Sequence, residues 1–152
     1  GSDEKAEIAA AHGCDHPVVY TRDSFLDKVM EVTDGEGVPV VYDSVGKDTL
    51  DDGLKCLRRH GRMVNFGTAS GPPPPVEVPR LQAKGLWVTR AGLANYLVTR
   101  ADIEERSADL FSAIKGGNLK IEIGQKFALS KAAEAHQALE SRSTTGSTIL
   151  IP

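Results

Sequence analysis

Helix-forming segments alternate with short apolar runs over the first half of the chain. The helix-forming segments cover residues 3–12, 25–33 and 48–59. The apolar runs that alternate with them cover residues 17–20, 38–46 and 61–67. Short, nearly continuous apolar runs are typical of strands that are buried on both faces of a parallel sheet. The repeated helix–strand order therefore predicts an α/β fold with right-handed crossovers and a parallel sheet.

Residues with capping preferences mark the ends of the predicted helices. Ser2 and Ser24 precede the first and second helical segments, and Gly13 follows the first. A serine side chain accepts a hydrogen bond from the N–H groups of a first helical turn, and glycine readily adopts the left-handed conformation that ends a helix. These positions predict that helices begin directly after Ser2 and Ser24.

Four consecutive prolines, Pro72–Pro75, separate this region from the next elements. A proline run excludes helix and favours an extended loop. Residues 86–89 then form a short apolar run that predicts a strand. Thr99 precedes a helical segment at 100–115, and Gly116 ends it.

The pattern changes at Leu119. Residues 120–123 alternate between polar and apolar, which predicts a half-exposed strand. We expect Ser130 to cap a helix over 131–141, and residues 147–151 predict a terminal strand. This end of the chain is expected to be a different structural unit, or a return to one.

Composition restricts the classes of function. The chain has 152 residues, 40% of them hydrophobic, and a formal net charge of -3, so no basic face suggests a nucleic-acid partner. No apolar run approaches the roughly 20 residues that a membrane helix needs. Cys14 and Cys56 are far apart and suit a reducing compartment better than a disulfide framework. Together with the lack of a membrane-length apolar run, they predict a cytoplasmic protein with no membrane partner.

The loop at Gly67–Gly71 is the first candidate for a ligand site. It follows a predicted strand, and open α/β sheets bind ligands outside the carboxyl ends of their strands. The alternative is that Gly67 and Gly71 only form a turn. On this stretch alone, the two interpretations stay open.

The start of the first predicted helix is a second candidate. Ser2 and Lys5 lie one turn apart on one face there. In a dinucleotide-binding fold, a hydroxyl and a lysine at a helix N-terminus suit the 2′-phosphate of a nucleotide, whereas an acidic residue would suit the 2′-hydroxyl of NAD. The alternative is an N-cap serine with a solvated lysine.

Two further strand ends carry candidate side chains. Tyr20 ends its apolar run, so its phenol can lie over the same nucleotide, although a half-buried tyrosine at the rim is the alternative. Residues 43–46 end the second apolar run, and their small side chains would let a cofactor approach the backbone closely. The alternative for this segment is a turn that leads into a helix.

Several chemical signatures do not occur in the sequence. The four histidines have no partners at metal-ligand spacing, so no metal site is expected. The sequence has neither a nucleophile elbow nor a phosphate-binding P-loop. The Gly-x-Gly-x-x-Gly fingerprint is also missing, and its expected place between a first strand and a first helix precedes residue 1.

A combination of four segments resembles a known family. These segments are Val41–Gly46, Gly61–Gly67, Leu139–Ser147 and Leu150–Pro152. Together they resemble the quinone oxidoreductases, the zinc-free, zeta-crystallin-related branch of the medium-chain dehydrogenase/reductase superfamily. The resemblance covers the chain from Ser2 to Pro152.

The resemblance implies an NADPH-dependent reductase with two domains. Residues 1–118 would form a partial NADP-binding Rossmann domain without its first strand and glycine loop, and residues 119–152 would return to the GroES-like catalytic domain. The family also implies a homodimer through the edge strand near Trp87. The substrate would be a small quinone-type molecule.

The resemblance also implies the cofactor-binding residues. Ser2, Lys5 and Tyr20 would form the 2′-phosphate pocket. The nicotinamide end and the strand ends beside it would be lined by Ser44, Val45, Phe66, Gly67, Thr68, Ala69, Ser70, Ala91, Gly92 and Leu93. Arg142 would be a late cofactor-binding arginine. No catalytic residue is assigned, because no Tyr or His has a demonstrable partner.

The implied reaction is hydride transfer from NADPH to a quinone or a related electron-poor acceptor. Because the glycine loop that normally holds the pyrophosphate is missing, we expect little or no turnover from the 152-residue chain alone. We also expect two unpaired sheet edges where the first strand is missing, closed by the surviving strands or by a second copy. The alternative function is a non-catalytic nucleotide-binding or self-associating Rossmann fragment.

Overall fold

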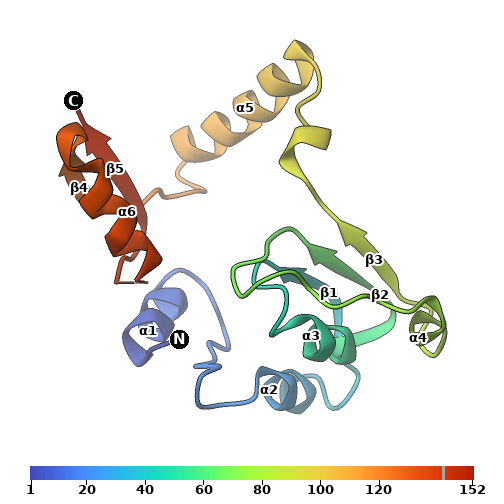
Figure 1. Ribbon diagram of the computed structural model, residues 1–152. Helices are drawn as coiled ribbons and strands as arrows, with labels where there is room; N and C mark the ends of the chain where they lie inside the picture. The colour runs from blue at the N-terminus through green and yellow to red at the C-terminus, as the bar shows by residue number, and fades with distance from the viewer. Residues whose placement is uncertain (142) are drawn as a thin grey trace. The chain divides into compact units, whose positions relative to one another are not determined.

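The computed structural model describes residues 1–141 and 143–152, which form two compact units. Unit 1 comprises Gly1–Tyr96 and unit 2 comprises Leu97–Pro152. Both units mix helices with parallel strands, as the α/β prediction requires (Figure 1). The prediction of an α/β chain is confirmed.

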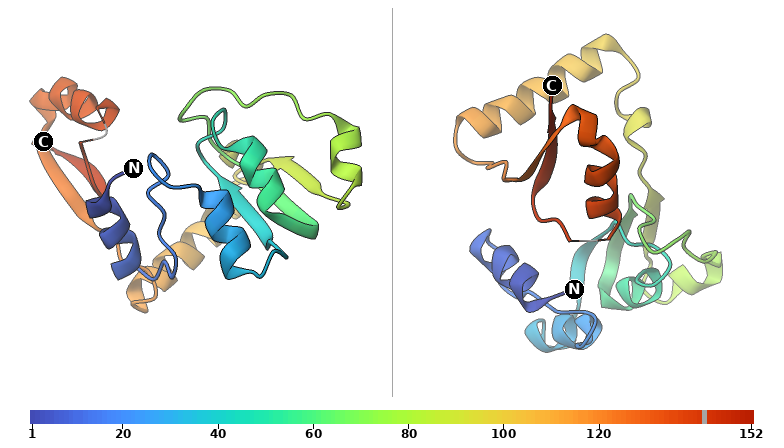
Figure 2. Two further views of the ribbon diagram at one scale, coloured as in Figure 1. Left: turned by 90° about the horizontal axis from the view of Figure 1, so that it is seen from below. Right: turned by 60° about the vertical axis from the view of Figure 1, so that its left-hand side comes forward.

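Unit 1 is built on a three-stranded parallel sheet in the order β1-β2-β3. The strands are β1 (Val38–Asp43), β2 (Leu57–Asn65) and β3 (Trp87–Arg90). Its helical elements are α1 (Asp3–Ala11), α2 (Phe25–Val32), α3 (Leu50–Cys56), α4 (Val78–Gln82) and the 3-10 turn η1 (Leu93–Asn95). Helices α2 and α3 lie side by side, and α3 packs on β1 and β2 (Figures 1 and 2).

The core of unit 1 lies between α3 and β2. Leu50 and Leu54 of α3 meet Leu57 and Met63 of β2, and all four side chains are buried. Partly buried side chains surround this cluster, namely Val38, Val41, Val76, Leu81 and Leu86. Burial of such apolar surface is the main stabilising contribution to a fold of this size. The cluster holds β2 at the centre of the sheet.

Unit 2 contains α5 (Arg100–Lys115), β4 (Ile123–Ala128), the 3-10 turn η2 (Leu129–Lys131), α6 (Ala132–Glu140) and β5 (Ser147–Ile151). Strands β4 and β5 pair in parallel. Helix α6 packs against both strands, so this end of the chain is a small strand–helix–strand unit (Figure 2). The predicted terminal strand over 147–151 is confirmed.

Side-chain capping is confirmed at three predicted helix starts. The Lys5 N–H donates to Oγ of Ser2 at 3.3 Å, and the Asp27 N–H donates to Oγ of Ser24 at 3.1 Å. At α5, Thr99 and Asp102 form a reciprocal capping box. Local hydroxyl-to-backbone bonds of this kind depend on sequence neighbours only, which is why the sequence predicts them.

The strand predicted at residues 17–20 is wrong. These residues adopt no regular structure, although the Val19 side chain is buried. A strand needs a neighbour for its N–H and C=O groups, and none of the described strands pairs with this segment. The carbonyl of Val19 instead accepts from the N–H groups of Arg22 and Asp23. Closure of the sheet by this segment is therefore not seen.

Three predicted boundaries also shift. Helix α3 ends at Cys56 rather than at residue 59, because Leu57 already pairs with Val38 as the first residue of β2. Strand β4 covers 123–128 instead of 120–123, because its register is set by pairing with β5. Helix α6 begins at Ala132, and Ser130 lies within η2 instead of capping it.

No helix among the described residues is long and apolar enough to cross a membrane.

Candidate functional site

The last residues of the three strands in unit 1 form one row across the sheet. Asp43 of β1 is in register with Asn65 of β2, and Asn65 is in register with Arg90 of β3. All three residues therefore lie at the carboxyl edge of a parallel sheet, where α/β proteins bind ligands. Asp43 and Asn65 are almost completely buried, with exposed fractions of 5% and 3%.

The carboxylate of Asp43 organises the segment that follows β1. Its Oδ1 accepts hydrogen bonds from the N–H of Val45 at 2.8 Å, from the N–H of Gly46 at 3.1 Å and from Oγ1 of Thr49 at 2.8 Å. Its Oδ2 accepts from Nδ2 of Asn65 at 3.1 Å. Four donors thus hold one buried carboxylate and the turn that leads into α3.

These contacts decide the protonation of Asp43. Burial of the carboxylate raises its pKa, but the hydrogen bonds from Thr49, Gly46, Val45 and Asn65 act in the opposite direction and together prevail. The pKa of Asp43 therefore lies below its usual range. The side chain is an ionised structural acceptor at neutral pH and has no proton to donate.

The loop at Gly67–Gly71 rests on the segment after β1. The N–H of Ala69 donates to the carbonyl of Ser44 at 3.2 Å, and the N–H of Ser70 donates to the carbonyl of Val45 at 2.9 Å. Oγ of Ser70 also donates to the Val45 carbonyl at 3.0 Å. The structure therefore brings together two segments that the sequence placed at separate strand ends.

Glycine permits this backbone contact at two positions. A Cβ on Gly67 would collide with the Ser44 carbonyl, and a Cβ on Gly46 would lie 2.8 Å from the carbonyl oxygen of Gly71. Gly46 also has a φ of 92°, which side-chain-bearing residues rarely adopt. The two glycines allow the loops after β1 and β2 to touch.

The other predicted residues of this edge flank the two loops. Phe66 directly follows β2 and is 52% exposed. The N–H of Ala91 donates to the carbonyl of Asn65 at 2.9 Å, which fixes the start of the segment after β3. Gly92 precedes η1, and Leu93 opens it with an exposed side chain. Thr68 lies in the loop, where its carbonyl accepts from the N–H of Gly71 at 2.9 Å.

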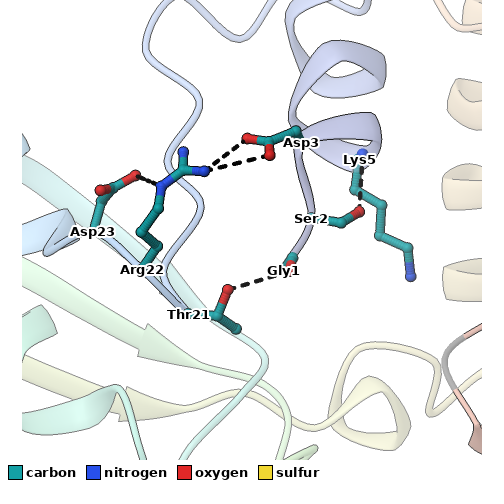
Figure 3. A network of polar contacts seen from close by, with 7 residues as sticks. All are labelled: Gly1, Ser2, Asp3, Lys5, Thr21, Arg22 and Asp23. Atoms are coloured by element: carbon teal, nitrogen blue, oxygen red, sulfur yellow. Dashed lines mark hydrogen bonds and ion pairs between the residues drawn. The ribbon is translucent and has the colours of Figure 1, made fainter.

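The predicted nucleotide residues lie at the start of α1. Ser2 caps the helix, and Lys5 extends from its first turn (Figure 3). Tyr20 is about half exposed, and a Cβ on Gly1 would lie 3.5 Å from its hydroxyl oxygen. Chain segments 1–5 and 20–22 therefore meet here, joined by a hydrogen bond from Oγ1 of Thr21 to the carbonyl of Gly1 at 3.2 Å.

Arg22 belongs to the same network, although no sequence pattern predicted it. Its Nη1 donates to both carboxylate oxygens of Asp3, at 3.2 and 3.3 Å, and its Nε donates to Oδ2 of Asp23 at 3.1 Å (Figure 3). Hydrogen bonding and charge from Asp23, and then from Asp3, raise the pKa of Arg22. In Figure 3, Lys5 extends on the side of α1 away from Arg22. Nothing in the local sequence reveals that Arg22 returns to the first helix.

A cavity of about 410 Å³ adjoins the start of α1. Ser2 and Lys5 are among its lining residues, and most of the others are apolar. These others are Gly1, Ala6, Ala9, Cys14, His16, Pro17, Val18, Phe25, Lys28, Val29 and Val32. The cavity thus combines a mostly apolar lining with Ser2, His16 and two lysines, Lys5 and Lys28.

The remaining points concern Arg142, two residues that were not predicted, and metal binding. Arg142 lies outside the described residues. Asn65 and Arg90 were not predicted; Arg90 directly follows the apolar run at 86–89, which was a usable signal, whereas Asn65 lies within the run at 61–67. Among residues 1–141 and 143–152, no cluster of His, Cys, Asp or Glu side chains is arranged to hold a metal ion, and the absence of zinc stays a prediction.

The sequence profile of a family described as "Zinc-binding dehydrogenase" matches residues 12–150. The chain belongs to this family. The predicted membership of the quinone oxidoreductase group within it is confirmed by relatives of that name at 43–46% identity.

Curated relatives and solved structures define the similarity further. A quinone oxidoreductase of Pseudomonas aeruginosa is 45% identical over 152 residues, which are 99% of this chain and 47% of that protein. A 2-haloacrylate reductase of a Burkholderia species is 43% identical over 153 residues, which are 99% of this chain and 46% of that protein.

Among solved structures, Escherichia coli quinone oxidoreductase complexed with NADPH matches with a TM-score of 0.93 at 42% identity. The match covers 100% of this chain and 48% of that one. The family member described here therefore spans about half the length of the relatives it matches. Its structural neighbours include NADPH complexes, which agrees with the predicted cofactor.

Proposed function

We propose that this chain carries the NADPH-binding half of a quinone oxidoreductase, which reduces a quinone or a related electron-poor acceptor. The observation that carries the proposal is the row of Asp43, Asn65 and Arg90, which gathers the loops after all three strands at one sheet edge. The NADPH complexes among the similar solved structures support the choice of cofactor.

The side chains at two places fit the chemistry of NADPH. At the start of α1, the Lys5 amine and the Ser2 hydroxyl suit the 2′-phosphate, and Tyr20 lies in the adjoining segment. At the sheet edge, exposed Phe66 and small residues leave room for a planar ring. The residues assigned to that end are Ser44, Val45, Gly67, Thr68, Ala69, Ser70, Ala91, Gly92 and Leu93, with Arg142 added by resemblance alone.

The bound cofactor would supply the hydride, and the residues of this chain would bind it, orient it and exclude water. The buried Asp43–Asn65 pair would keep the loops at 44–46 and 67–71 in one fixed arrangement. A fixed arrangement matters because a hydride donor and acceptor react only when they are held in close, aligned contact. No residue of the chain is assigned as a proton donor.

A titration of the 152-residue chain with NADPH and NADH tests the proposal. Trp87 is the only tryptophan, so its fluorescence reports on the chain without a label. We expect NADPH to bind more tightly than NADH, and Lys5→Ala to weaken NADPH binding by about 10-fold, because a charge-assisted hydrogen bond is lost. Lys55→Ala, which removes a lysine on α3, is the matched control. Failure of NADPH to bind would contradict the proposal.

A related acceptor is also proposed. The similarity to a 2-haloacrylate reductase favours a carboxylate-bearing alkene as a second acceptor class, and so does Arg90 at the sheet edge, which pairs with no carboxylate among the described residues. Competition between a quinone and such an alkene for the NADPH-loaded protein would distinguish the two classes.

Self-association is the competing function. Strand β3 pairs only with β2 among the described strands, and Trp87 on it is 66% exposed. An unpaired strand edge favours pairing with another chain, so we propose a homodimer through β3. Light scattering of the wild type and of Val88→Pro tests it: the proline removes a backbone donor from β3 and should yield monomers, whereas an unchanged mass would contradict this interface.

The domain boundary and the cellular location of the protein are also proposed. We propose that residues 1–118 belong to the Rossmann part and 119–152 to the catalytic domain of the whole protein, whereas contacts within this chain divide it after Tyr96. The free thiols of Cys14 and Cys56 support a reducing, cytoplasmic location.

A further inference from the structure

Arg90 is held at the end of β3 by two neutral acceptors. Its Nη1 donates to the carbonyl oxygen of Gly67 at 2.9 Å and also to Oδ1 of Asn65. Both acceptors are uncharged, so they orient the guanidinium without forming an ion pair with it. The contact with Gly67 attaches Arg90 to the loop assigned above to the cofactor.

Hydrogen bonds also fix the residues that surround Arg90. Asn65 Nδ2 donates to Asp43 and to the carbonyl of Gly67, and the backbone carbonyl of Asn65 accepts from the N–H of Ala91. The arginine is thus anchored through its side chain, and the backbone directly after it is anchored as well. A donor that is fixed before its ligand arrives loses little entropy on binding.

Arg90 differs from four other arginines of the chain in its lack of a carboxylate partner among the described residues. Ion pairs with carboxylates are formed by Arg22, Arg58, Arg80 and Arg100. Arg90 forms no such pair within the part of the chain that the structure describes, and its Nε and Nη2 donate to no residue there. A guanidinium has five N–H donors in a planar fork that matches a carboxylate or another oxygen pair.

We propose that Arg90 binds an oxygen atom of the electron acceptor through Nε and Nη2. This inference rests on the function proposed above and names the residue that recognises the acceptor. The oxygen is the carbonyl oxygen of a quinone or a carboxylate oxygen of an alkene acid. When a carbonyl acceptor gains the hydride, its oxygen becomes anionic, and a proton from water completes the reduction. Arg90 stabilises the negative charge and stays protonated throughout.

Nuclear magnetic resonance of the 152-residue chain tests this assignment without turnover. The Nε–H resonance of Arg90 is identified by its loss in Arg90→Lys. Two probes are then titrated separately: tetramethyl-1,4-benzoquinone, which has no free ring position for thiol addition, and benzoate. We expect a saturable shift of the Arg90 resonance with at least one probe, and the responding probe tells which oxygen chemistry is bound.

Variants complete the test. Arg90→Gln should weaken binding of the responding probe by about 10-fold or more, since a hydrogen bond to a charged donor is lost. Arg90→Lys keeps the charge without the fork and should restore part of the affinity. Arg59→Gln, on β2, is the control, because Arg59 also forms no ion pair with any residue that the structure describes. No shift with either probe, or wild-type affinity in Arg90→Gln and Arg90→Lys, would overturn the inference.

The same samples separate this inference from the proposed function. If NADPH binds but the Arg90 resonance shifts with neither probe, the role of Arg90 is overturned and the proposed function is not. Probe binding at Arg90 without any NADPH binding overturns the proposed function and leaves an oxygen-binding arginine.

Discussion

Nδ2 of Asn65 donates a hydrogen bond of 3.1 Å to Oδ2 of Asp43, across the ends of two parallel strands. Through this bond the buried amide links β1 to the loop at Gly67, because the same nitrogen donates to the Gly67 carbonyl at 3.1 Å. The candidate site therefore depends on one buried pair.

Replacement of Asn65 by leucine should destabilise unit 1. Asn65→Leu leaves the buried Oδ2 of Asp43 without the hydrogen bond from Asn65, which costs about 1–3 kcal/mol of unfolding free energy. Urea unfolding followed by circular dichroism measures the change. Asn95→Ala, which removes an exposed asparagine from η1, should leave the unfolding free energy nearly unchanged. Equal effects of the two variants would show that the buried pair contributes nothing specific.

Acid should destabilise the protein through Asp43. Because its pKa is lowered on folding, the ionised carboxylate contributes stability above the pKa of the unfolded chain, near 4 for an ordinary Asp, as a rough guide. That contribution is lost as the pH falls through the lower pKa of the folded state. Unfolding free energies measured between neutral pH and strongly acidic pH should show this loss.

Asp43→Asn should remove the contribution of Asp43 to the acid dependence and destabilise the protein at neutral pH. Asp109→Asn, on α5, is the matched control and should keep the acid dependence of the wild type. A wild-type slope in Asp43→Asn would contradict the assignment.

Gly13 and Gly46 have the same φ of 92°, so alanine substitutions at these two positions distinguish the cost of backbone strain from that of a steric collision. A Cβ on Gly13 would meet nothing within 4 Å, whereas a Cβ on Gly46 would lie 2.8 Å from the Gly71 oxygen. Gly13→Ala should therefore cost about 1–2 kcal/mol from the left-handed conformation alone. Gly46→Ala should cost clearly more and should also weaken NADPH binding, since the loops must separate. Identical costs in urea unfolding would mean that the loop contact is readily relieved.

The two thiols should differ sharply in reactivity. Cys14 is exposed, whereas Cys56 is 1% exposed and burial raises its pKa. Since the thiolate is the reactive form, a disulfide reagent at neutral pH should modify one thiol rapidly and the second only on unfolding. Cys14→Ser should abolish the rapid phase. A rapid phase that survives in Cys14→Ser would show that the α3–β2 core opens easily.

The sequence predicted the helices of this chain better than its strands. The starts of α1, α2 and α5 follow from Ser2, Ser24 and Thr99, because a capping bond joins residues three positions apart. The strand predicted at residues 17–20 has the same apolar character as β1, yet it forms no strand. None of the described strands pairs with it, and strand pairing is a property of distant residues.

The candidate site, too, was predictable from the sequence only in part. The family, the cofactor class and the loop at Gly67–Gly71 could be inferred from short motifs. The meeting of this loop with Ser44 and Val45 could not, because residues about 25 positions apart are brought together only by the register of β1 and β2. For the same reason Arg90 was overlooked, since only the pairing of β3 with β2 places it beside Asn65.

By itself, the sequence determined the α/β class, the family and the positions of the capped helices, which depend on local composition and short-range hydrogen bonds. The tertiary structure decided which strands exist, where β2 and β4 begin, and that Asp43, Asn65 and Arg90 form one row. Those features depend on hydrogen bonds between strands and on burial of α3 against β2, and neither interaction is confined to a sequence window.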